Sequence, residues 1–466
     1  MSSYQNIVIE LKKVLGEHKV STAKKDLEAS SHDTWPLMTK LNLLDQHPNM
    51  ADIVVRAESD DDICKVLDIA NREKIPTTVR ALASSVTGQP LPTKGGIVLD
   101  ISEIPSGFTV NEANMTVTAT CSFNGGDLED LLQKQGWTLG HSPQSLYRST
   151  VGGWLATLAT GQFSSLYGGI EDLVVGYDVI LATGEKMPLR ANPRAAMGPD
   201  LRQIFLGSEG TLGVITSVTL KVFPIQEAES LMTYAVPTVM DGLAMMREIA
   251  AANLKPFLVR LYDTEEAKHA MQDTLFATPV IFLGSRGLTP MVEAEQNVLN
   301  HIVVKHGGQA IGAKGVQGWM DRRYDFSTVE NLLATKGGFG ETIEIAHNWD
   351  SIHDLWKDLK QALDPLADEV ISHFSHIYTQ GTSMYVILLG AEEDNEKCVE
   401  TLRAIWKTTM EICLEHGAEL SHHHGGGLAR SPYSRRSIGD SHLILRKLKQ
   451  ALDPNAILNP GKLGLD

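Results

Sequence analysis

The sequence contains few cysteines, and those it has are far apart. Only Cys64, Cys121, Cys398 and Cys413 occur in 466 residues, and no two of them form a CxxC pair. So few thiols in so long a chain exclude a disulfide scaffold, and their spacing matches no zinc motif. A reduced, cytoplasmic setting is the simplest expectation.

Long apolar runs and an excess of basic charge are also absent. No apolar run approaches the roughly 18 residues of a membrane-spanning helix, and the charged N-terminal stretch lacks the apolar core of a signal peptide. Lys and Arg number 41 against 57 Asp and Glu, which gives a net charge of −16. Because broad nucleic-acid surfaces need basic charge, we expect no nucleic acid among the partners.

The hydrophobic pattern predicts several domains, as the length does at roughly 150 residues per domain. Residues 49–56, 75–80 and 95–100 are typical of strands, and 60–72 of a helix that Ser59 caps. Beyond residue 226, helices are expected at 240–252, 290–306, 350–365 and 393–416. We expect a helical segment at 1–44, a cofactor domain at 45–225, a substrate domain at 226–420 and a returning His loop and helix at 421–466.

Glycine and hydroxyl residues are concentrated in two segments, HSPQSLYRSTVGGWLATLATG at 141–161 and GSEGTLGVIT at 207–216. Glycines allow the backbone to approach a ligand, and successive N–H groups form an anion site. Gly152 and Gly153 begin an expected helix, whose N-terminus favours negative charge. Tight turns are the alternative reading of any one segment. No strand–GxGxxG–helix unit or P-loop is present, which argues against both of those nucleotide sites.

The segments at 141–175 and 207–216 resemble the flavin-binding signatures of the vanillyl-alcohol-oxidase superfamily. The resemblance implies an α+β fold, with a two-subdomain FAD-binding domain and an α/β cap (substrate) domain containing an antiparallel sheet. It also implies a pyrophosphate loop at 80–90, where Leu82 and Ala83 replace the usual glycines. Ser84 stands where covalent flavoproteins of the family often have His, so noncovalent FAD is expected. The cofactor-binding residues that the resemblance implies are Ser84, Ser85, Thr87, Gly88, Gln89, Pro143, Ser149, Thr150, Gly152, Gly153, Thr157, Gly161, Tyr167, Gly168, Glu209, Gly213 and Ile215.

The second half carries candidate catalytic side chains. Arg260 lies in an apolar strand-like run, where its guanidinium suits either a carboxylate ligand or a structural ion pair. Tyr378 is either a core residue or a proton donor and acceptor. His422, His423 and His424 precede three glycines, and acid–base chemistry is favoured over a metal site, so no metal is predicted. Arg322, Arg323 and Arg430 are weaker candidates, at least two of them expected at the solvated surface.

Segments around Arg260, Tyr378 and the His run resemble the alkylglycerone-phosphate synthase family, whereas the chain's ending resembles the D-lactate and glycolate dehydrogenase branch. The metal element HxGDGNxH of that branch lacks its second His and its acidic residue here, in the run 376–383. We expect a homodimeric, FAD-dependent oxidoreductase that oxidises a small anionic alcohol or hydroxy acid by hydride transfer to flavin N5. The alternative is a synthase-like transferase that forms an ether bond through a flavin N5 adduct without net redox. A non-enzymatic FAD-binding protein is disfavoured, because the candidate catalytic residues persist.

Overall fold

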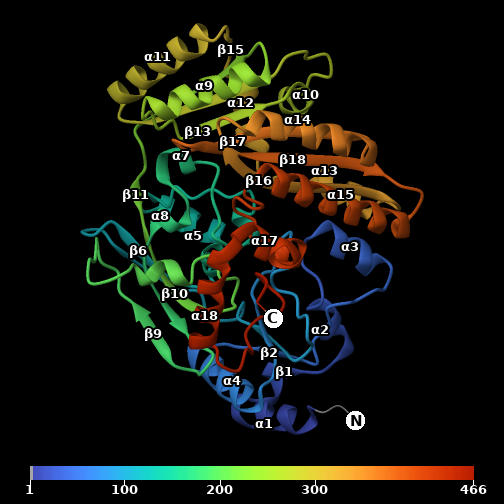
Figure 1. Ribbon diagram of the computed structural model, residues 1–466. Helices are drawn as coiled ribbons and strands as arrows, with labels where there is room; N and C mark the ends of the chain where they lie inside the picture. The colour runs from blue at the N-terminus through green and yellow to red at the C-terminus, as the bar shows by residue number, and fades with distance from the viewer. Residues whose placement is uncertain (1–3, 466) are drawn as a thin grey trace.

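The computed structural model describes residues 4–465 and divides into two halves (Figure 1). The lower half holds two main sheets, and the upper half is built on one large sheet with its helices. Residues 1–3 and 466, the outer ends of the first and last predicted segments, lie outside the described part. Within the described range, no helix combines the length and apolarity that crossing a membrane requires.

The first sheet has the order β1-β2-β4-β3, with β2, β4 and β3 parallel. Ile53, Val54 and Val55 of β2 are all buried, as expected of a central parallel strand. Helix α4 follows β2, and Ser59 caps it by accepting from the Asp62 N–H. The strands are β1 (Val20–Ser21), β2 (Ile53–Arg56), β3 (Thr77–Arg80) and β4 (Ile97–Asp100). The helices here are α1 (Gln5–Leu15), α2 (Lys24–Ala29), α3 (Pro36–Leu43) and α4 (Asp60–Glu73).

The second sheet is antiparallel, in the order β5-β6-β10-β8-β9, and a short ribbon pairs β11 with β7. Its strands are β5 (Phe108–Asn111), β6 (Thr116–Thr120), β8 (Val174–Ile180), β9 (Lys186–Leu189) and β10 (Val214–Lys221), and the ribbon is β7 (Trp137–Thr138) with β11 (Phe223–Pro224). The helices around it are α5 (Gly125–Gln133), α6 (Val151–Thr157), α7 (Ser164–Tyr167) and α8 (Ile170–Leu173).

The large sheet is antiparallel, with seven strands in the order β15-β12-β14-β13-β17-β18-β16. Its strands are β12 (Ala228–Ala235), β13 (Leu258–Tyr262), β14 (Val280–Gly287), β15 (Gln309–Gly312), β16 (Gly338–Asn348), β17 (Glu369–Ile377) and β18 (Gly381–Ala391). The accompanying helices are α9 (Val239–Ala251), α10 (Thr264–Met271), α11 (Thr289–Lys305), α12 (Lys314–Arg322), α13 (Ser327–Ala334), α14 (Ile352–Leu363) and α15 (Asn395–His416). The expected α+β architecture with an antiparallel sheet in the second half is confirmed.

The C-terminal segment crosses back to the lower half, where α18 lies in red in Figure 1. It contains α16 (Gly427–Arg430), α17 (Ser434–Ile438) and α18 (His442–Leu452). The buried Lys449 ammonium donates to the Thr211 carbonyl at 2.8 Å, and the Thr77 N–H donates to the Ile457 carbonyl at 2.7 Å. These buried bonds hold the C-terminal segment, which begins with the His loop at residues 421–427, against the lower half.

Candidate active site

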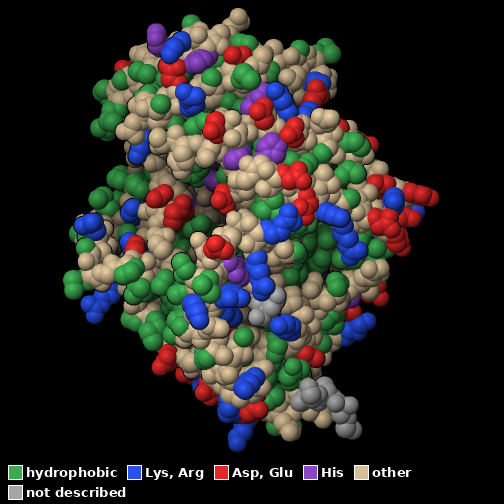
Figure 2. Space-filling view, viewed as in Figure 1, with side chains coloured by type: hydrophobic (Ala, Val, Ile, Leu, Met, Phe, Trp, Pro, Cys, Tyr) green, Lys and Arg blue, Asp and Glu red, His purple; other side chains and the backbone are tan. Residues whose placement is uncertain are grey.

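A cavity of about 780 Å³ lies between the two halves. The lower half contributes residues from 79–90, 143–162 and 208–215. The glycine pattern indicated the second and third of these segments, and the family resemblance implied the first. The upper half contributes side chains of β13, β16, β17 and β18 together with the His loop. Figure 2 shows histidine side chains at the surface where the halves meet.

The loop at 80–90 offers free backbone donors to this cavity. The N–H groups of residues 82–86 have no acceptor among residues 4–465, and all five residues line the cavity. Ala83 has a φ of 52°, a left-handed conformation that turns successive N–H groups toward one side. Unpaired N–H groups in this arrangement suit an anion, although Leu82 and Ala83 stand where glycines were expected.

At the start of α6, the backbone N–H groups of the two glycines are already hydrogen-bonded, and the contribution of this segment to the cavity is open space. The N–H of Gly152 donates to the Cys121 carbonyl at 2.9 Å, and that of Gly153 to Thr150 Oγ1 at 3.3 Å. A Cβ on Gly152 would lie 2.7 Å from the Cys121 Cβ, so this glycine lets α6 pack on the sheet. A Cβ on Gly153 would meet only Thr150 Oγ1, at 3.2 Å, which leaves that side of α6 open toward the cavity.

The structure brings most of the predicted cofactor residues together. Those that line the cavity are Ser84, Ser85, Gln89, Pro143, Ser149, Thr150, Gly152, Gly153, Thr157, Glu209, Gly213 and Ile215. Those that lie outside its lining are Thr87, Gly88, Gly161, Tyr167 and Gly168. Buried Thr87 instead donates to Gln89 Oε1 at 2.8 Å, and the Gly88 N–H donates to Asp33 Oδ2 at 2.8 Å. Asp33, which the sequence patterns did not reveal, also lines the cavity and therefore holds the loop at that wall.

The upper wall is one row of cross-strand neighbours. Tyr262 pairs with His373, His373 with Tyr385, and Tyr385 with Glu344 across β13, β17, β18 and β16. Side chains directly opposite in adjacent strands lie on the same face. Arg260, two residues before Tyr262, shares that face and lines the cavity. Sequence reasoning identified Arg260 but missed His373, Tyr385 and Glu344, because only the strand register brings them together.

Arg260 is 7% exposed and has only neutral partners on the protein side. Its Nε donates to the Tyr262 hydroxyl at 2.9 Å and its Nη2 to His373 Nε2 at 2.8 Å. Because Nε2 of His373 accepts, the ring proton is on Nδ1, which donates to Glu266 at 2.7 Å. Burial raises the pKa of Glu266 to about 8, against the effect of Arg260. Within the described chain, no carboxylate lies within ion-pair distance of this guanidinium.

The His loop is held by a buried carboxylate of the upper half. Glu344 accepts the backbone N–H groups of His422, His423 and His424, the last at 2.8 Å. Its carboxylate also lies 3.2 Å from the guanidinium of Arg430. Burial favours the neutral acid, but Arg430 and the histidines lower the pKa of Glu344 to about 2. Glu344 is therefore charged at neutral pH.

A second carboxylate holds the loop from the lower half. Glu209 accepts the N–H groups of Gly426 and Gly427, the latter at 3.0 Å. Burial raises the pKa of Glu209 to about 6, with these backbone donors and Lys462 acting in the opposite direction. The same burial lowers the pKa of Lys462 to about 8.

The three weaker arginine candidates have structural partners. Arg430 is 2% exposed and donates to the carbonyls of Gly425 and Glu344 at 2.8 and 2.9 Å, so it is not one of those at the solvated surface. Arg322 donates to the Ala270 carbonyl at 2.8 Å, and Arg323 lies 4.4 Å over the Tyr324 ring. None of the three lines the cavity.

Two tyrosines contact the imidazoles of the His loop. The Tyr378 hydroxyl lies 2.6 Å from His422 Nε2, and the Tyr385 hydroxyl lies 2.6 Å from His423 Nε2 and 3.1 Å from His424 Nε2. Tyr385, His423 and His424 line the cavity, whereas Tyr378 and His422 do not. The Tyr378 side chain is 37% exposed. The predicted tyrosine thus lies at the outer side of the cluster and the missed one at the inner side.

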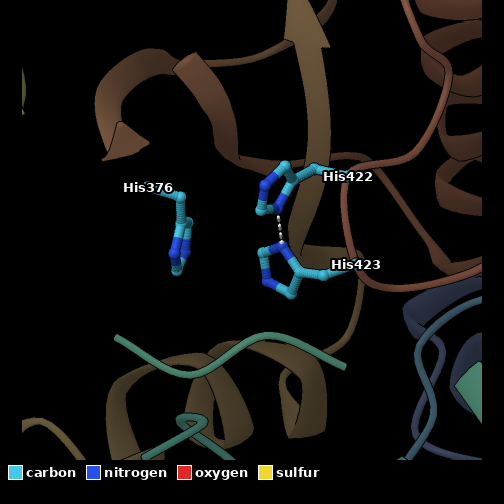
Figure 3. Close-up of side chains that lie close together, drawn as sticks. All are labelled: His376, His422 and His423. Atoms are coloured by element: carbon cyan, nitrogen blue, oxygen red, sulfur yellow. Dashed lines mark hydrogen bonds between the residues drawn. The ribbon is translucent and has the colours of Figure 1, made fainter. Parts of the chain in front are cut away.

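His376 joins this cluster through a bulge in β17. The register shifts between Ser375 and Ile377, and the intervening His376 has a φ of 58°. Its Nδ1 lies 2.7 Å from the Ser164 hydroxyl, and its ring stacks on His422 at 4.9 Å (Figure 3). Ring nitrogens of His376, His422 and His423 lie within 4.8 Å of one another, a spacing that a metal ion could bridge. The absence of a metal stays a prediction.

Comparison with known proteins gives the family. Residues 225–463 match the model of the C-terminal domain of FAD linked oxidases, and residues 51–189 match an FAD binding domain. The chain belongs to the FAD-linked oxidases. It is 31% identical over 98% of both chains to the uncharacterized FAD-linked oxidoreductase YgcU of Escherichia coli K12. It is 28% identical to the alkyldihydroxyacetonephosphate synthase of Dictyostelium discoideum, over 90% of this chain and 74% of the relative.

Solved structures show the same fold. A structure of alkyldihydroxyacetonephosphate synthase superimposes with a TM-score of 0.81 at 24% identity, covering 98% of this chain and 86% of that one. A 4-ethylphenol oxidase from Gulosibacter chungangensis gives a TM-score of 0.82 at 15% identity, covering 100% and 98%. The resemblance to the vanillyl-alcohol-oxidase superfamily, with motifs like those of the synthase, is confirmed. This FAD-linked oxidase is an FAD-dependent enzyme.

The cavity fits the cofactor of this family. Five unpaired N–H groups at 82–86 suit the pyrophosphate, and Gln162 Oε1 is buried at the cavity without a partner in the described chain. Gly153 leaves room at the start of α6. These residues would hold FAD through backbone and amide groups, while the ionisable groups of the upper wall stay available for a substrate.

Proposed function

We propose that this enzyme oxidises a small anionic alcohol, a hydroxy acid in particular. The observation that carries the proposal is Arg260, a buried guanidinium that faces the cavity with only neutral protein partners. A buried cation without a countercharge is stabilised by an anionic ligand. Relatives support this class, since the glycolate oxidase subunit GlcD of Bacillus subtilis is 25% identical over 90% of both chains.

In this proposal, Arg260 binds the carboxylate and orients the carbinol carbon. The neighbouring Tyr385 stacks on His373, with ring centroids 4.6 Å apart, and its hydroxyl takes the proton of the substrate alcohol. FAD, when bound, would supply the acceptor for the two electrons that leave the carbinol carbon as hydride. Burial lowers the pKa of His423 to about 3 and that of His424 to about 4, so both imidazoles are neutral, and Nε2 of His423 can accept that proton.

We infer noncovalent binding of FAD because Ser84, which cannot carry the flavin as a histidine does, lines the cavity at the loop position. A homodimer and a cytoplasmic location belong to the same proposal. They rest on the family resemblance and on the reduced state of the cysteines, all four of which are free thiols.

Ether-bond formation by a synthase-like transfer is the second candidate. The observation that favours it is an apolar end of the cavity, where Leu43, Phe326, Val329 and Leu333 line the space between α3 and α13. An alkyl chain would bury apolar surface there. The likeness to the Dictyostelium synthase supports the same reading.

One experiment separates the two candidates. Purified protein is denatured with acid to release flavin, and anaerobic holoenzyme is titrated with hydroxy acids and neutral alcohols while flavin absorbance is followed. Bleaching by a hydroxy acid is the expected result. Ether formation from an acyl dihydroxyacetone phosphate and a fatty alcohol, without bleaching, would replace the oxidase with the transferase.

Arg260→Lys tests the anion site. Lysine keeps the charge but loses the planar fork, so we expect KM for the anionic substrate to rise about tenfold or more with flavin content unchanged. The matched control is Arg436→Lys, at an exposed ion pair with Glu411. An unchanged KM in Arg260→Lys would remove this residue from substrate binding.

A further inference from the structure

The hydroxyls and imidazoles at the His loop form one unbroken chain of hydrogen bonds. Tyr385 Oη lies 2.6 Å from His423 Nε2, His423 Nδ1 lies 2.7 Å from His422 Nδ1, and His422 Nε2 lies 2.6 Å from Tyr378 Oη. Figure 3 shows the central bond between the two imidazoles. The chain of hydrogen bonds begins at Tyr385, which lines the cavity, and ends at Tyr378, a residue that is 37% exposed.

The donors and acceptors of this chain are mutually consistent. An N···N contact of 2.7 Å requires that one Nδ1 carries a proton and the other does not. If His423 carries it, its Nε2 accepts from Tyr385, and His422 has its proton on Nε2 and donates to Tyr378. Every bond then points outward, from the cavity to Tyr378. His424 Nε2 is free to donate to the Tyr385 hydroxyl at 3.1 Å.

The surroundings keep the chain aligned and uncharged. Glu344 fixes the backbone of all three histidines, so the two rings are held at one separation. Burial lowers the pKa of His422 to about 3 and that of His423 to the same value, so neither ring traps a proton. Partial burial, together with the charges of Glu171 and Asp172, raises the pKa of Tyr378, which keeps its phenol protonated.

We propose that Tyr385, His423, His422 and Tyr378 form a proton relay that carries the alcohol proton from the cavity to the surface. The proposal rests on the oxidation described above and deepens it, because it assigns the inner role to Tyr385 and the exit to Tyr378.

The transfer balances at every atom. The substrate O–H bond breaks as an O–H bond forms at Tyr385, whose own proton passes to Nε2 of His423. The Nδ1 proton of His423 passes to Nδ1 of His422, and the Nε2 proton of His422 passes to Tyr378. The original Tyr378 proton leaves to water. Each group ends with as many protons as it had, and the hydride goes to FAD.

A metal ion is the competing use of the same atoms. An ion bound by His376, His422 and His423 would take a free lone pair on one nitrogen of each ring, whereas the relay uses both nitrogens of His422 and of His423 in hydrogen bonds. A bound metal would therefore break the chain at one or more of these nitrogens.

Nitrogen NMR of histidine-labelled holoenzyme tests the relay without any substrate. The expected result is one Nδ1–H and one Nε2–H tautomer, with scalar coupling between the two Nδ1 nuclei across the hydrogen bond. Loss of this coupling in His422→Gln identifies the pair. Absence of the coupling in the wild type, or its replacement by metal-bound shifts that a chelator reverses, would overturn the relay.

Kinetics of flavin reduction supply the second test. In Tyr378→Phe we expect reduction about 10²-fold slower with KM unchanged, a larger solvent isotope effect, and partial rescue by a small buffer acid–base such as imidazole. Tyr147→Phe is the matched control, since that phenol is exposed, bonds only to Asp130 at 3.0 Å and does not line the cavity. A wild-type rate and isotope effect in Tyr378→Phe would remove it as the exit.

The two tests separate this proposal from the proposed function. If no alcohol reduces the flavin but the Nδ1 coupling is present, the oxidation fails while the hydrogen-bonded chain stands without that role. If an alcohol reduces the flavin and the coupling is absent, the oxidation stands and the relay fails.

Discussion

The lower and upper walls of the cavity are built in different ways. The lower wall uses short continuous segments, in which residues 82–86, with N–H groups that are unpaired in the described chain, and the open side of Gly153 line the cavity. The upper wall uses charged, imidazole and phenolic side chains from separate strands. These side chains form hydrogen bonds with one another in the described chain. A cofactor site made from backbone is local in sequence, whereas a site made from a side-chain network exists only through strand register.

The His loop joins the two walls, and each wall holds it with one buried carboxylate. Glu344 is paired with Arg430 at 3.2 Å, and its pKa falls to about 2. Glu209 has no such close partner, and its pKa rises to about 6. Both carboxylates thus hold the backbone of the His loop. The charged form of Glu344 is strongly stabilised, whereas the charged form of Glu209 is poorly stabilised.

Replacing the upper anchor should have the largest effect. In Glu344→Gln, the buried guanidinium of Arg430 loses its countercharge, and the loop keeps at most part of its backbone acceptors. Breaking a buried ion pair costs about 3–5 kcal/mol, and we expect that loss in urea unfolding at pH 7 together with loss of turnover. The control is Glu248→Gln, at a surface contact with Lys305 and His306, where the change should stay within about 0.5 kcal/mol. Equal stability of the two variants would contradict the role of Glu344.

Blocking the lower wall should remove the cofactor without unfolding the upper wall. In Gly153→Trp, the indole would occupy the open space beside Thr150, so we expect purified protein without flavin absorbance but with native far-UV circular dichroism. Gly107→Trp is the control, because a Cβ there meets nothing within 4 Å. A yellow Gly153→Trp protein that retains stoichiometric FAD would show that α6 does not face the cofactor.

The contrast between the two walls also explains which parts of the structure could be predicted from the sequence. The helices expected at 240–252, 290–306 and 393–416 agree with α9, α11 and α15 to within two residues, because their apolar spacing is local. Glycine and hydroxyl clusters likewise predicted the lower-wall segments around 141–161 and 207–216, whereas the loop at 80–90 was expected only from the family resemblance. Tyr385 and Glu344 were missed because each is one polar residue in a strand, and only the pairing of β16 with β18 makes them neighbours. His376 enters the site through a bulge that no pattern in the sequence marks.

The dependence of the unfolding free energy on pH below 7 should differ between Glu344 and Glu209. The folded-state pKa of Glu344 is lowered from 4.5 to about 2, so its contribution is present above pH 4.5 and is lost as the pH falls toward 2. That contribution is about 3 kcal/mol, from 1.36 kcal/mol per pKa unit. Unfolding free energies measured from pH 7 to pH 3 in the wild type should fall over this window more than in Glu344→Gln. Parallel curves would contradict a charged Glu344.

Glu209 should give the smallest effect, and one of opposite sign. Its folded-state pKa is raised from 4.5 to about 6, so the native state binds the proton more tightly than the unfolded chain does. Stability from this residue therefore increases as the pH falls from 6 to 4.5, by about 2 kcal/mol, and is absent above pH 6. The difference between wild-type and Glu209→Gln unfolding free energies should change by that amount across this window and stay level above it. If the difference in unfolding free energy stays constant from pH 7 to pH 4.5, the folded protein stabilises the charged form of Glu209, as it does that of Glu344. The two carboxylates would then not differ in this respect.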